Sequence, residues 1–278
     1  MESLGLFFAL GAALCWGSYM VPFKSSSFSP ILYQAVMGVG VLISGLVLTL
    51  LMGYSFELNV YGLMCGVLWA VANIIFISAI TNLGLSKAIP ITSSLVILTS
   101  FIWGSLVFKE LETGLVIAIL SISLIILGVL LVGSIGHSQT QSMKKGLLSA
   151  ILSGIIFGSQ FTPVQIAKVN TSHFFFAMSV GVFITTLLIL IIKKSQPIKL
   201  SKEGLLSGAG WNLGNLFGAL AISMIGLSKG LPITQLSVVV GVSWGILYFK
   251  EVKGKKQIIQ IVLGTTIFLI GVGLLSLA

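Results

Sequence analysis

Residues 62–76, GLMCGVLWAVANIIF, recur as GLLSGAGWNLGNLFG at residues 204–218. The matched positions are two glycines, a tryptophan and an asparagine, namely Gly62, Gly66, Trp69 and Asn73 against Gly204, Gly208, Trp211 and Asn215. Three more blocks recur in the same order, 141 or 142 residues apart: CWGSYMVPFK (15–24) as FGSQFTPVQ (157–165), GLSKAIPIT (84–92) as GLSKGLPIT (226–234), and WGSLVFKE (103–110) as WGILYFKE (244–251). Four ordered matches at one spacing indicate that the chain is built from two copies of one unit.

The composition is typical of a membrane protein. Of the 278 residues, 56% are hydrophobic and 8% are charged, whereas soluble domains average about 25% charged residues. So apolar a chain cannot cover its surface with polar groups, and its solvent must be lipid. The net charge is +9 and all 15 basic residues are lysines. Because they lie in short loops and form no long basic patch, we expect no nucleic-acid partner.

The apolar runs predict ten transmembrane helices. A spanning helix needs about 20 mostly apolar residues, and the runs of that kind are 3–23, 30–52, 60–81, 87–108, 114–134, 146–167, 172–192, 204–224, 230–249 and 257–277. Each unit holds five spans, so the second copy enters the membrane upside down. We therefore predict an all-α, polytopic membrane protein with a 5+5 inverted repeat. Residues 1–135 and 146–278 form the two repeats, and residues 136–145 form the linker.

Lysine placement predicts the orientation of the chain. Twelve of the fifteen lysines follow the odd-numbered spans, and the opposite side holds Lys109, Lys168 and Lys229. Because cytoplasmic loops carry the excess of basic residues, we expect both termini outside. The predicted location is the plasma membrane, which the chain crosses many times.

Two tryptophan–asparagine pairs are the first candidates for a binding site. Trp69 and Asn73 are four residues apart and share one helix face, and Trp211 and Asn215 repeat this arrangement with Asn212 beside them. A carboxamide in hydrocarbon is costly unless it is paired, so these side chains should face the protein interior. Amides and indole rings suit the hydroxyls and the apolar face of a sugar. The simpler alternative is an interhelical hydrogen bond beside a packed tryptophan.

Proline interrupts the first and sixth spans at matching places. Pro22 follows Ser18, and Pro163 follows Ser159, in both cases by four residues. Proline removes a backbone donor and kinks or breaks a helix, and interrupted helices in both halves indicate a transport site. We therefore add Ser18, Ser159 and Gln160 to the predicted cavity as second choices, together with Gln235, which lies in the polar segment after Pro232 of the ninth span. A purely structural kink is the alternative.

The lysines of the two GLSK blocks have two interpretations. Lys87 and Lys229 either extend to the membrane interface or serve as a gate or contact for an anionic substrate at a helix N-terminus. The pairs Lys109/Glu110 and Lys250/Glu251 are predicted to be interfacial ion pairs that stop the fourth and ninth spans, and a gate role is the less favoured alternative.

Several kinds of chemistry are absent from the sequence. All six acidic residues lie in or beside loops, which disfavours export of cations through a buried carboxylate. There is no Walker A, GxSxG or HExxH motif. Cys15 and Cys65 lie inside apolar runs and have no metal-ligand spacing. We expect no enzyme, no catalytic residue, no metal and no cofactor; the expected partners are a small-molecule substrate and the lipid bilayer, with the chain as a monomer or homodimer.

The CWGS start, the GLMCGVLWAVAN third span, the GLS starts and the FKE endings resemble the glucose/ribose porter family of the drug/metabolite transporter superfamily. The likeness covers nearly the whole chain. It implies an EamA-like fold and uptake of a monosaccharide such as glucose or ribose. The lysine of both GLSK blocks departs from that pattern and is more similar to the G-x-x-N-K pattern of nucleotide-sugar transporters, in which the lysine meets phosphate.

The leading hypothesis is therefore a secondary transporter that moves a small polyhydroxylated metabolite, of the glucose or ribose type, by alternating access. A carrier of an anionic metabolite, such as a sugar phosphate or nucleotide sugar, is the first alternative. A membrane protein that transports nothing, such as a sensor or an assembly factor, is the second.

Overall fold

The computed structural model describes residues 2–108, 115–133, 141–194, 200–225 and 233–275, whose regular structure is helical, with no strand among them. The prediction of an all-α protein is thus confirmed for the described chain. The helices are α1 (Glu2–Ser18), α2 (Val21–Ser25), α3 (Pro30–Met52), α4 (Val60–Leu83), α5 (Leu85–Ile102), η1 (Trp103–Val107), α6 (Leu115–Gly133), α7 (Gln141–Gly158), α8 (Thr162–Ile166), α9 (Thr171–Ile192), α10 (Lys202–Ile225), α12 (Ser237–Ser243), η2 (Trp244–Tyr248) and α13 (Lys255–Leu275).

Seven helical segments of the described chain are long and apolar enough to cross a membrane. They are Glu2–Ser25, Pro30–Met52, Val60–Leu83, Leu85–Val107, Ser142–Ile166, Thr171–Ile192 and Lys255–Leu275. The other three expected spans coincide with helices that are shorter or less apolar. Val116–Val132 and Ser237–Tyr248 are shorter apolar helices, and α10 has 24 residues but carries many Gly, Ser and Asn residues.

Local sequence explains where the long helices begin and end. Ser29 accepts a hydrogen bond from the amide of Leu32 at the start of α3, just before Pro30. Asn59 does the same for α4, because its Oδ1 accepts from the amide of Tyr61 at 3.0 Å. Side-chain oxygens at this position satisfy amides that have no partner inside the helix. Gly53 ends α3 in the left-handed conformation, with φ of 63°, which costs glycine little.

The breaks predicted at the two prolines are confirmed. The first span is divided into α1 and α2 between Ser18 and Val21, and the sixth into α7 and α8 between Gly158 and Thr162. Proline occupies the first turn of both short helices, where its missing N–H leaves no hydrogen bond unmade.

Two π-helical turns also occupy matching places, and sequence analysis did not predict them. Helix α5 continues into η1 at Trp103, and α12 continues into η2 at Trp244. Each turn closes with an i→i+5 hydrogen bond, from the amide of Phe108 to Trp103 O at 3.1 Å and from Phe249 to Trp244 O at 3.0 Å. Turns of this kind are uncommon and occur frequently at functional sites.

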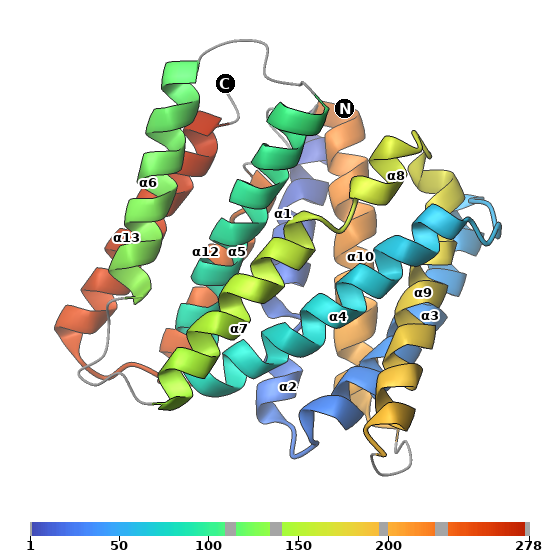
Figure 1. The fold of residues 1–278 in the computed structure, drawn as a ribbon, viewed down its shortest axis with the longest axis horizontal. Coiled ribbons are helices and arrows are strands. Elements are labelled where there is room, and N and C mark those ends of the chain that lie inside the picture. The colour runs from blue at the N-terminus through green and yellow to red at the C-terminus, as the bar shows by residue number, and fades with distance from the viewer. Residues whose placement is uncertain (1, 109–114, 134–140, 195–199, 226–232, 276–278) are drawn as a thin grey trace.

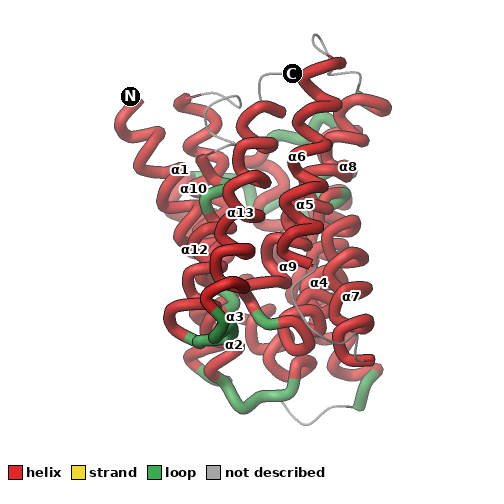
Figure 2. Tube along the Cα trace, turned by 90° about the vertical axis from the view of Figure 1, so that its left-hand side faces the viewer, coloured by secondary structure: helices red, strands yellow, loops and turns green. Residues whose placement is uncertain are grey.

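The most extensive helix contacts join the first half of the chain to the second. Helix α6 packs on α13, α1 on α10, α4 on α7 and α9, and α3 on α9 and α10. Figure 1 shows α6 and α13 together along one edge, and the start of α1 and the end of α13 at the same end of the bundle. Figure 2 shows the same helices running roughly along one common direction. The two halves are interlocked and do not form separate lobes.

Glycines make these contacts between the halves close. A Cβ on Gly66 of α4 would lie 2.2 Å from Met178 O of α9, and a Cβ on Gly208 of α10 would lie 2.2 Å from Met37 O of α3. Both distances are too short for a carbon atom, so only glycine permits these approaches. Met178 also follows Met37 by 141 residues, so the same contact is made twice with the halves exchanged.

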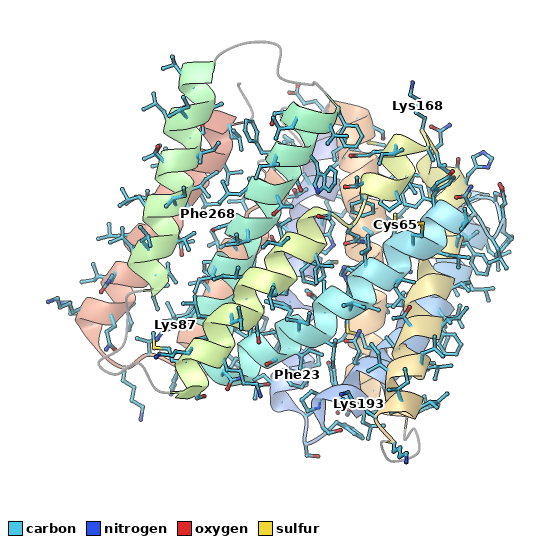
Figure 3. All side chains as sticks on the ribbon, in the orientation of Figure 1. Phe23, Cys65, Lys87, Lys168, Lys193 and Phe268 are labelled. Carbon is cyan, nitrogen blue, oxygen red and sulfur yellow. The ribbon has the colours of Figure 1, made fainter. Side chains whose placement is uncertain are left out.

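The outer surface is apolar, as lipid requires. Leu106 in η1 is 74% exposed and Leu247 in η2 is 73% exposed. A contiguous apolar surface of this kind is costly in water and favourable in the hydrocarbon core. In Figure 3, Lys87 and Lys193 lie toward one end of the bundle and Lys168 lies at the other. We call the end that carries Lys87 and Lys193 the lysine-rich end.

We predict that Gly208→Ala destabilises the protein, whereas Gly210→Ala on the same helix does not. A Cβ at Gly208 meets backbone atoms of α3, but a Cβ at Gly210 has Tyr19 Cβ as its neighbour, at 4.0 Å. Overpacking against a backbone costs about 1–3 kcal/mol. Thermal unfolding of both variants in the same detergent measures the difference. Equal melting temperatures would contradict the tight contact between α3 and α10.

Candidate functional site

Trp69 of α4 and Trp211 of α10 stack on each other where the two halves meet. Their ring centroids are 3.9 Å apart and the ring planes differ by 31°. Trp69 is 1% exposed and Trp211 is 5% exposed. The structure therefore brings together the two tryptophans that sequence analysis placed in one cavity, and in this conformation each indole has one face on the other.

Asn73 is fully occupied by protein partners. Its Nδ2 donates to Gln34 Oε1 at 2.6 Å, and its Oδ1 accepts from the Tyr19 hydroxyl at 3.2 Å. These bonds connect α4 to α3 and to the break between α1 and α2. A buried polar side chain with all its partners rigidifies its surroundings. In this conformation Asn73 corresponds to the simpler alternative, an interhelical hydrogen bond.

Asn212 and Asn215 have unpaired atoms. Asn215 Nδ2 and Asn212 Oδ1 are buried and have no hydrogen-bond partner within the described structure. Asn212 Nδ2, by contrast, donates to Val41 O at 3.1 Å and to the Ser44 and Ser179 hydroxyls. The two asparagines are three residues apart and are neighbours on the surface of α10. One unpaired donor and one unpaired acceptor therefore lie on one side of this helix.

A third unpaired group, the indole N–H of Trp16, lies on α1 beside α10. Trp16 Nε1 is buried without a partner in the described structure. Its ring packs on the glycines of α10, because a Cβ on Gly214 would lie 2.6 Å from Trp16 Cδ1. Sequence analysis did not select Trp16. Comparison of the two copies could have identified it, because Trp16 aligns with Phe157. Phenylalanine lacks the indole N–H group.

The two helix breaks are held by equivalent hydrogen bonds. Trp103 Nε1 donates to Ser159 Oγ at 2.9 Å, and Trp244 Nε1 donates to Ser18 Oγ at 2.9 Å. Each bond joins the π-helical turn of one half to the broken helix of the other. The two serines that were predicted for the cavity thus tie the breaks to η1 and η2.

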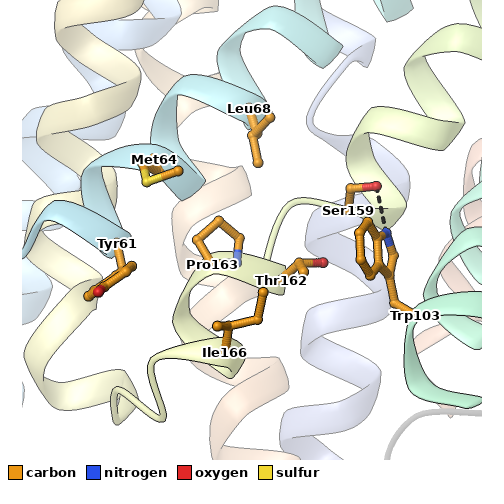
Figure 4. A pocket seen from close by; sticks show the side chains of 8 residues that line it. All are labelled: Tyr61, Met64, Leu68, Trp103, Ser159, Thr162, Pro163 and Ile166. Carbon is orange, nitrogen blue, oxygen red and sulfur yellow. Dashed lines mark hydrogen bonds between the residues drawn. The ribbon is translucent and has the colours of Figure 1, made fainter. Parts of the chain in front are cut away.

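Two hollows lie near the short helices α8 and α2. The first, of about 310 Å³, lies beside the break between α7 and α8 and is lined by Tyr61, Trp103, Ser159, Thr162 and Pro163, among others. Figure 4 shows the hydrogen bond between Trp103 and Ser159 on one side of it.

The second hollow is also of about 310 Å³ and lies near the end of α2, where Phe23, Lys24, Ile80, Thr81 and Gly84 are among its lining residues. Volumes of this size are at the lower end of ligand-binding pockets.

The other predicted residues are placed as follows. Gln160 is buried, with Nε2 3.7 Å from Met178 Sδ. Gln235 is half-buried in the turn before α12. Lys87 is half-buried near the start of α5 and interacts electrostatically with Glu251. Lys229 lies outside the described residues.

The predicted ion pair between Lys250 and Glu251 is wrong. Glu251 pairs instead with Lys24 at the end of α2. Both residues follow the end of η2, where Lys250 has a positive φ of 50°, and Glu251 contacts the start of α5 and Lys24 of the other half. The corresponding pair, Lys109 and Glu110, lies outside the described residues.

Apolar helices that cross the bilayer many times, with polar groups and helix breaks gathered at their contacts, define a multi-pass membrane protein. The family model described as "Sugar transport protein" matches residues 7–278. The chain therefore belongs to this family of transporters, which corresponds to the glucose/ribose porter family.

Named relatives cover almost the whole chain. The glucose uptake protein GlcU of Staphylococcus xylosus is 26% identical over 96% of both chains. A protein of Priestia megaterium named "Probable glucose uptake protein GlcU" is 23% identical over 99% of both. One crystal structure matches with a TM-score of 0.64 and 15% identity, covering 99% of this chain and 98% of the other. At that identity the likeness concerns the fold alone.

We predict that Asn73→Ala and Asn215→Ala differ in their effect on stability. Removing Asn73 takes away the partners of Gln34 Oε1 and of the Tyr19 hydroxyl, and an unpaired buried group costs about 1–3 kcal/mol. Asn215 Nδ2 has no partner to lose. Thermal unfolding in detergent should show a clear loss for Asn73→Ala and little change for Asn215→Ala. Equal losses would mean that Asn215 has a structural role.

Proposed function

We propose that this protein is a secondary transporter that moves a monosaccharide of the glucose or ribose type by alternating access. The sugar transport family and the glucose uptake proteins among the relatives support the substrate class. The observation that carries the proposal is the group of three unpaired polar atoms on the contacting helices α1 and α10, namely Trp16 Nε1, Asn212 Oδ1 and Asn215 Nδ2; the other two unpaired atoms of the described residues are the hydroxyl oxygens of Thr49 and Thr265.

A sugar would satisfy these atoms. Two of them are donors and one is an acceptor, and each hydroxyl of a sugar both donates and accepts. Buried polar atoms without partners are costly, so a ligand that pairs them recovers that cost on binding. Trp211 lies one helical turn before Asn215 on α10, with Trp69 stacked on it, and an indole face packs well on a pyranose ring. We propose that the substrate is bound when these two indoles separate and that it lies against one or both of them.

The proposed architecture is ten transmembrane helices in a 5+5 inverted repeat, comprising residues 1–135 and 146–278. Three pairs of equivalent features support it. They are the breaks at Pro22 and Pro163, the π-helical turns η1 and η2, and the close contacts of Gly66 and Gly208. In each pair, the feature of the first half contacts the second half, and the equivalent feature of the second half contacts the first. This is expected for units related by a two-fold axis in the membrane plane.

Alternating access follows from that exchange. Two equivalent halves can adopt each other's conformation, which moves the opening of a central site from one side of the membrane to the other. The hydrogen bonds from Trp103 to Ser159 and from Trp244 to Ser18 link the moving parts at each break. We propose that each bond forms and breaks as its own end of the transport path closes and opens.

The proposal of an anionic substrate has less support. Lys87 already interacts with the carboxylate of Glu251, although that carboxylate makes its direct ion pair with Lys24, and relatives are named for the uptake of glucose, which is neutral. Unlabelled glucose 6-phosphate is the probe for this alternative.

We predict that Asn215→Ala and Trp16→Phe each reduce sugar transport by about twofold to tenfold, because the net loss of one buried hydrogen bond is about 0.5–1.5 kcal/mol. Trp16→Phe introduces the residue that the second copy has at Phe157. Counterflow of radiolabelled glucose and ribose in proteoliposomes measures the effect. Asn170→Ala, at an exposed helix start without a side-chain cap, is the control and should transport normally.

Three outcomes contradict the proposal. Normal counterflow in both variants would show that the unpaired atoms do not bind the substrate. Inhibition by glucose 6-phosphate but not by glucose would favour the anionic alternative. If the wild-type protein exchanges none of these compounds, the proposed substrate class is wrong.

A further inference from the structure

The carboxylate of Glu251 is bound by three donors at the start of α5, besides Lys24. Oε1 accepts from the amide of Leu85 at 2.8 Å, and Oε2 accepts from the amide of Ser86 at 2.8 Å and from its hydroxyl at 2.7 Å. Oε1 also pairs with Lys24 Nζ. Glu251 belongs to the second half of the chain and its partners to the first. One side chain thus connects the end of η2 to α2 and α5.

Two glycines make room for this carboxylate. Gly84 has φ of 80°, and a Cβ there would lie 2.7 Å from Glu251 Oε2. A Cβ on Gly245, in η2, would lie equally close to the same oxygen. Both glycines belong to repeated blocks: Gly84 begins GLSKAIPIT, and Gly245 is the second residue of WGILYFKE. The carboxylate therefore occupies the position of an N-cap for α5, although it comes from the other half of the chain.

Charge compensation at Glu251 comes from two lysines. Lys24 of α2 forms the direct pair, and its Nζ also lies 4.8 Å from the centre of the Phe249 ring. Lys87 of α5 interacts through space. Burial alone would raise the pKa of Glu251, but the bonds from Lys24, Ser86 and Leu85 outweigh it and hold the pKa below its usual range. The side chain is therefore charged at neutral pH.

The second copy differs at one of these positions. Glu251 aligns with Glu110, and Ser86 aligns with Ser228, but Lys24 aligns with Gln165. The acid and the serine are duplicated, and the lysine is not. Glu110 and Ser228 lie outside the described residues, but Gln165 carries no charge, so a contact at the other end equivalent to the pair of Lys24 and Glu251 would have a neutral amide in place of the lysine.

We propose that Glu251, Lys24 and Ser86 form a gate, here called the Glu251 gate, which closes the lysine-rich end of the transport path and breaks whenever that end opens. This inference rests on the proposed alternating access. Opening must separate the buried carboxylate from Lys24 and from the α5 amides, which is strongly unfavourable unless water replaces them. Because the other end has Gln165, the gate biases the empty carrier toward closure at the lysine-rich end.

The test measures which end is open, without any substrate. Ile80→Cys and Thr162→Cys are made separately in a background with Cys15→Ala and Cys65→Ala. Ile80 is 2% exposed and lines the hollow beside the gate, and Thr162 is 8% exposed and lines the hollow at the opposite break. A small membrane-impermeant thiosulfonate reagent labels each position in proteoliposomes or inverted vesicles, and the rates are compared with and without Glu251→Gln or Lys24→Gln.

The gate predicts opposite changes at the two ends. Glu251→Gln and Lys24→Gln should raise labelling of Ile80→Cys about tenfold and lower labelling of Thr162→Cys, since a two-state carrier that opens one end closes the other. Lys24→Arg keeps the ion pair and should restore the wild-type rates. Lys193→Gln removes another lysine from the same end and is the matched control, with no expected change. The double variant should match the single ones, because both remove one interaction.

Two results would overturn the gate. Unchanged labelling at both positions means that the cluster does not restrain opening. Increased labelling at both positions means that it is merely structural and that its loss loosens the fold. If the two labelling rates change in opposite directions but the protein does not exchange sugar, the proposed substrate is rejected and the gate is still supported.

Discussion

In lipid, every buried polar group must find its partner within the protein, and this constraint organises the structure. The outer faces of the helices are apolar, whereas the polar side chains lie at contacts between helices. Asn73 is paired with Gln34 and Tyr19, each broken helix is tied to a π-helical turn by a tryptophan, and the carboxylate of Glu251 is enclosed by donors. Because the polar groups named above are paired, a buried polar atom without a partner indicates a position where a ligand could bind. Of the five residues with such an atom in the described chain, Trp16, Asn212 and Asn215 lie on the contacting helices α1 and α10, and Thr49 and Thr265 lie on α3 and α13.

The same constraint explains why the halves are interlocked. A helix cannot expose broken backbone to hydrocarbon, so the interruptions near Pro22 and Pro163 must be covered by the other half. Helices α10 and α4 provide this cover, because α10 packs on α1 and α2, and α4 packs on α7 and α8. The resulting interface is formed twice from the same residue types. That arrangement is needed for two halves that exchange conformations, because each interaction that breaks in one half has an equivalent that forms in the other.

Much of the fold was predictable because its signals are local. Apolar runs mark the helices, and the helix breaks follow from proline at matching places in two copies. The π-helical turns were missed, since WGSLVFKE and WGILYFKE resemble ordinary helix ends. The candidate site was less predictable, because partners are chosen across long separations. Lys24 and Glu251 are 227 positions apart, so the adjacent Lys250 seemed the natural partner. Likewise Asn73 and Asn215 align, but the partners of Asn73 align with Phe175 and Gln160, which explains why one amide is paired and the other is not.

We expect the residues that differ between the two copies to determine the function. The repeated residues, such as Gly66 and Gly208, maintain a framework that serves both ends equally. A carrier whose halves were identical would have two ends of equal stability and a site with two-fold symmetry, whereas a sugar has no such symmetry. Trp16 provides an indole donor where the second copy has phenylalanine, and Lys24 provides the ion pair with Glu251 where the second copy has Gln165. In the proposed mechanism the first difference suits an asymmetric substrate, and the second makes closure of the lysine-rich end the more stable state of the empty carrier.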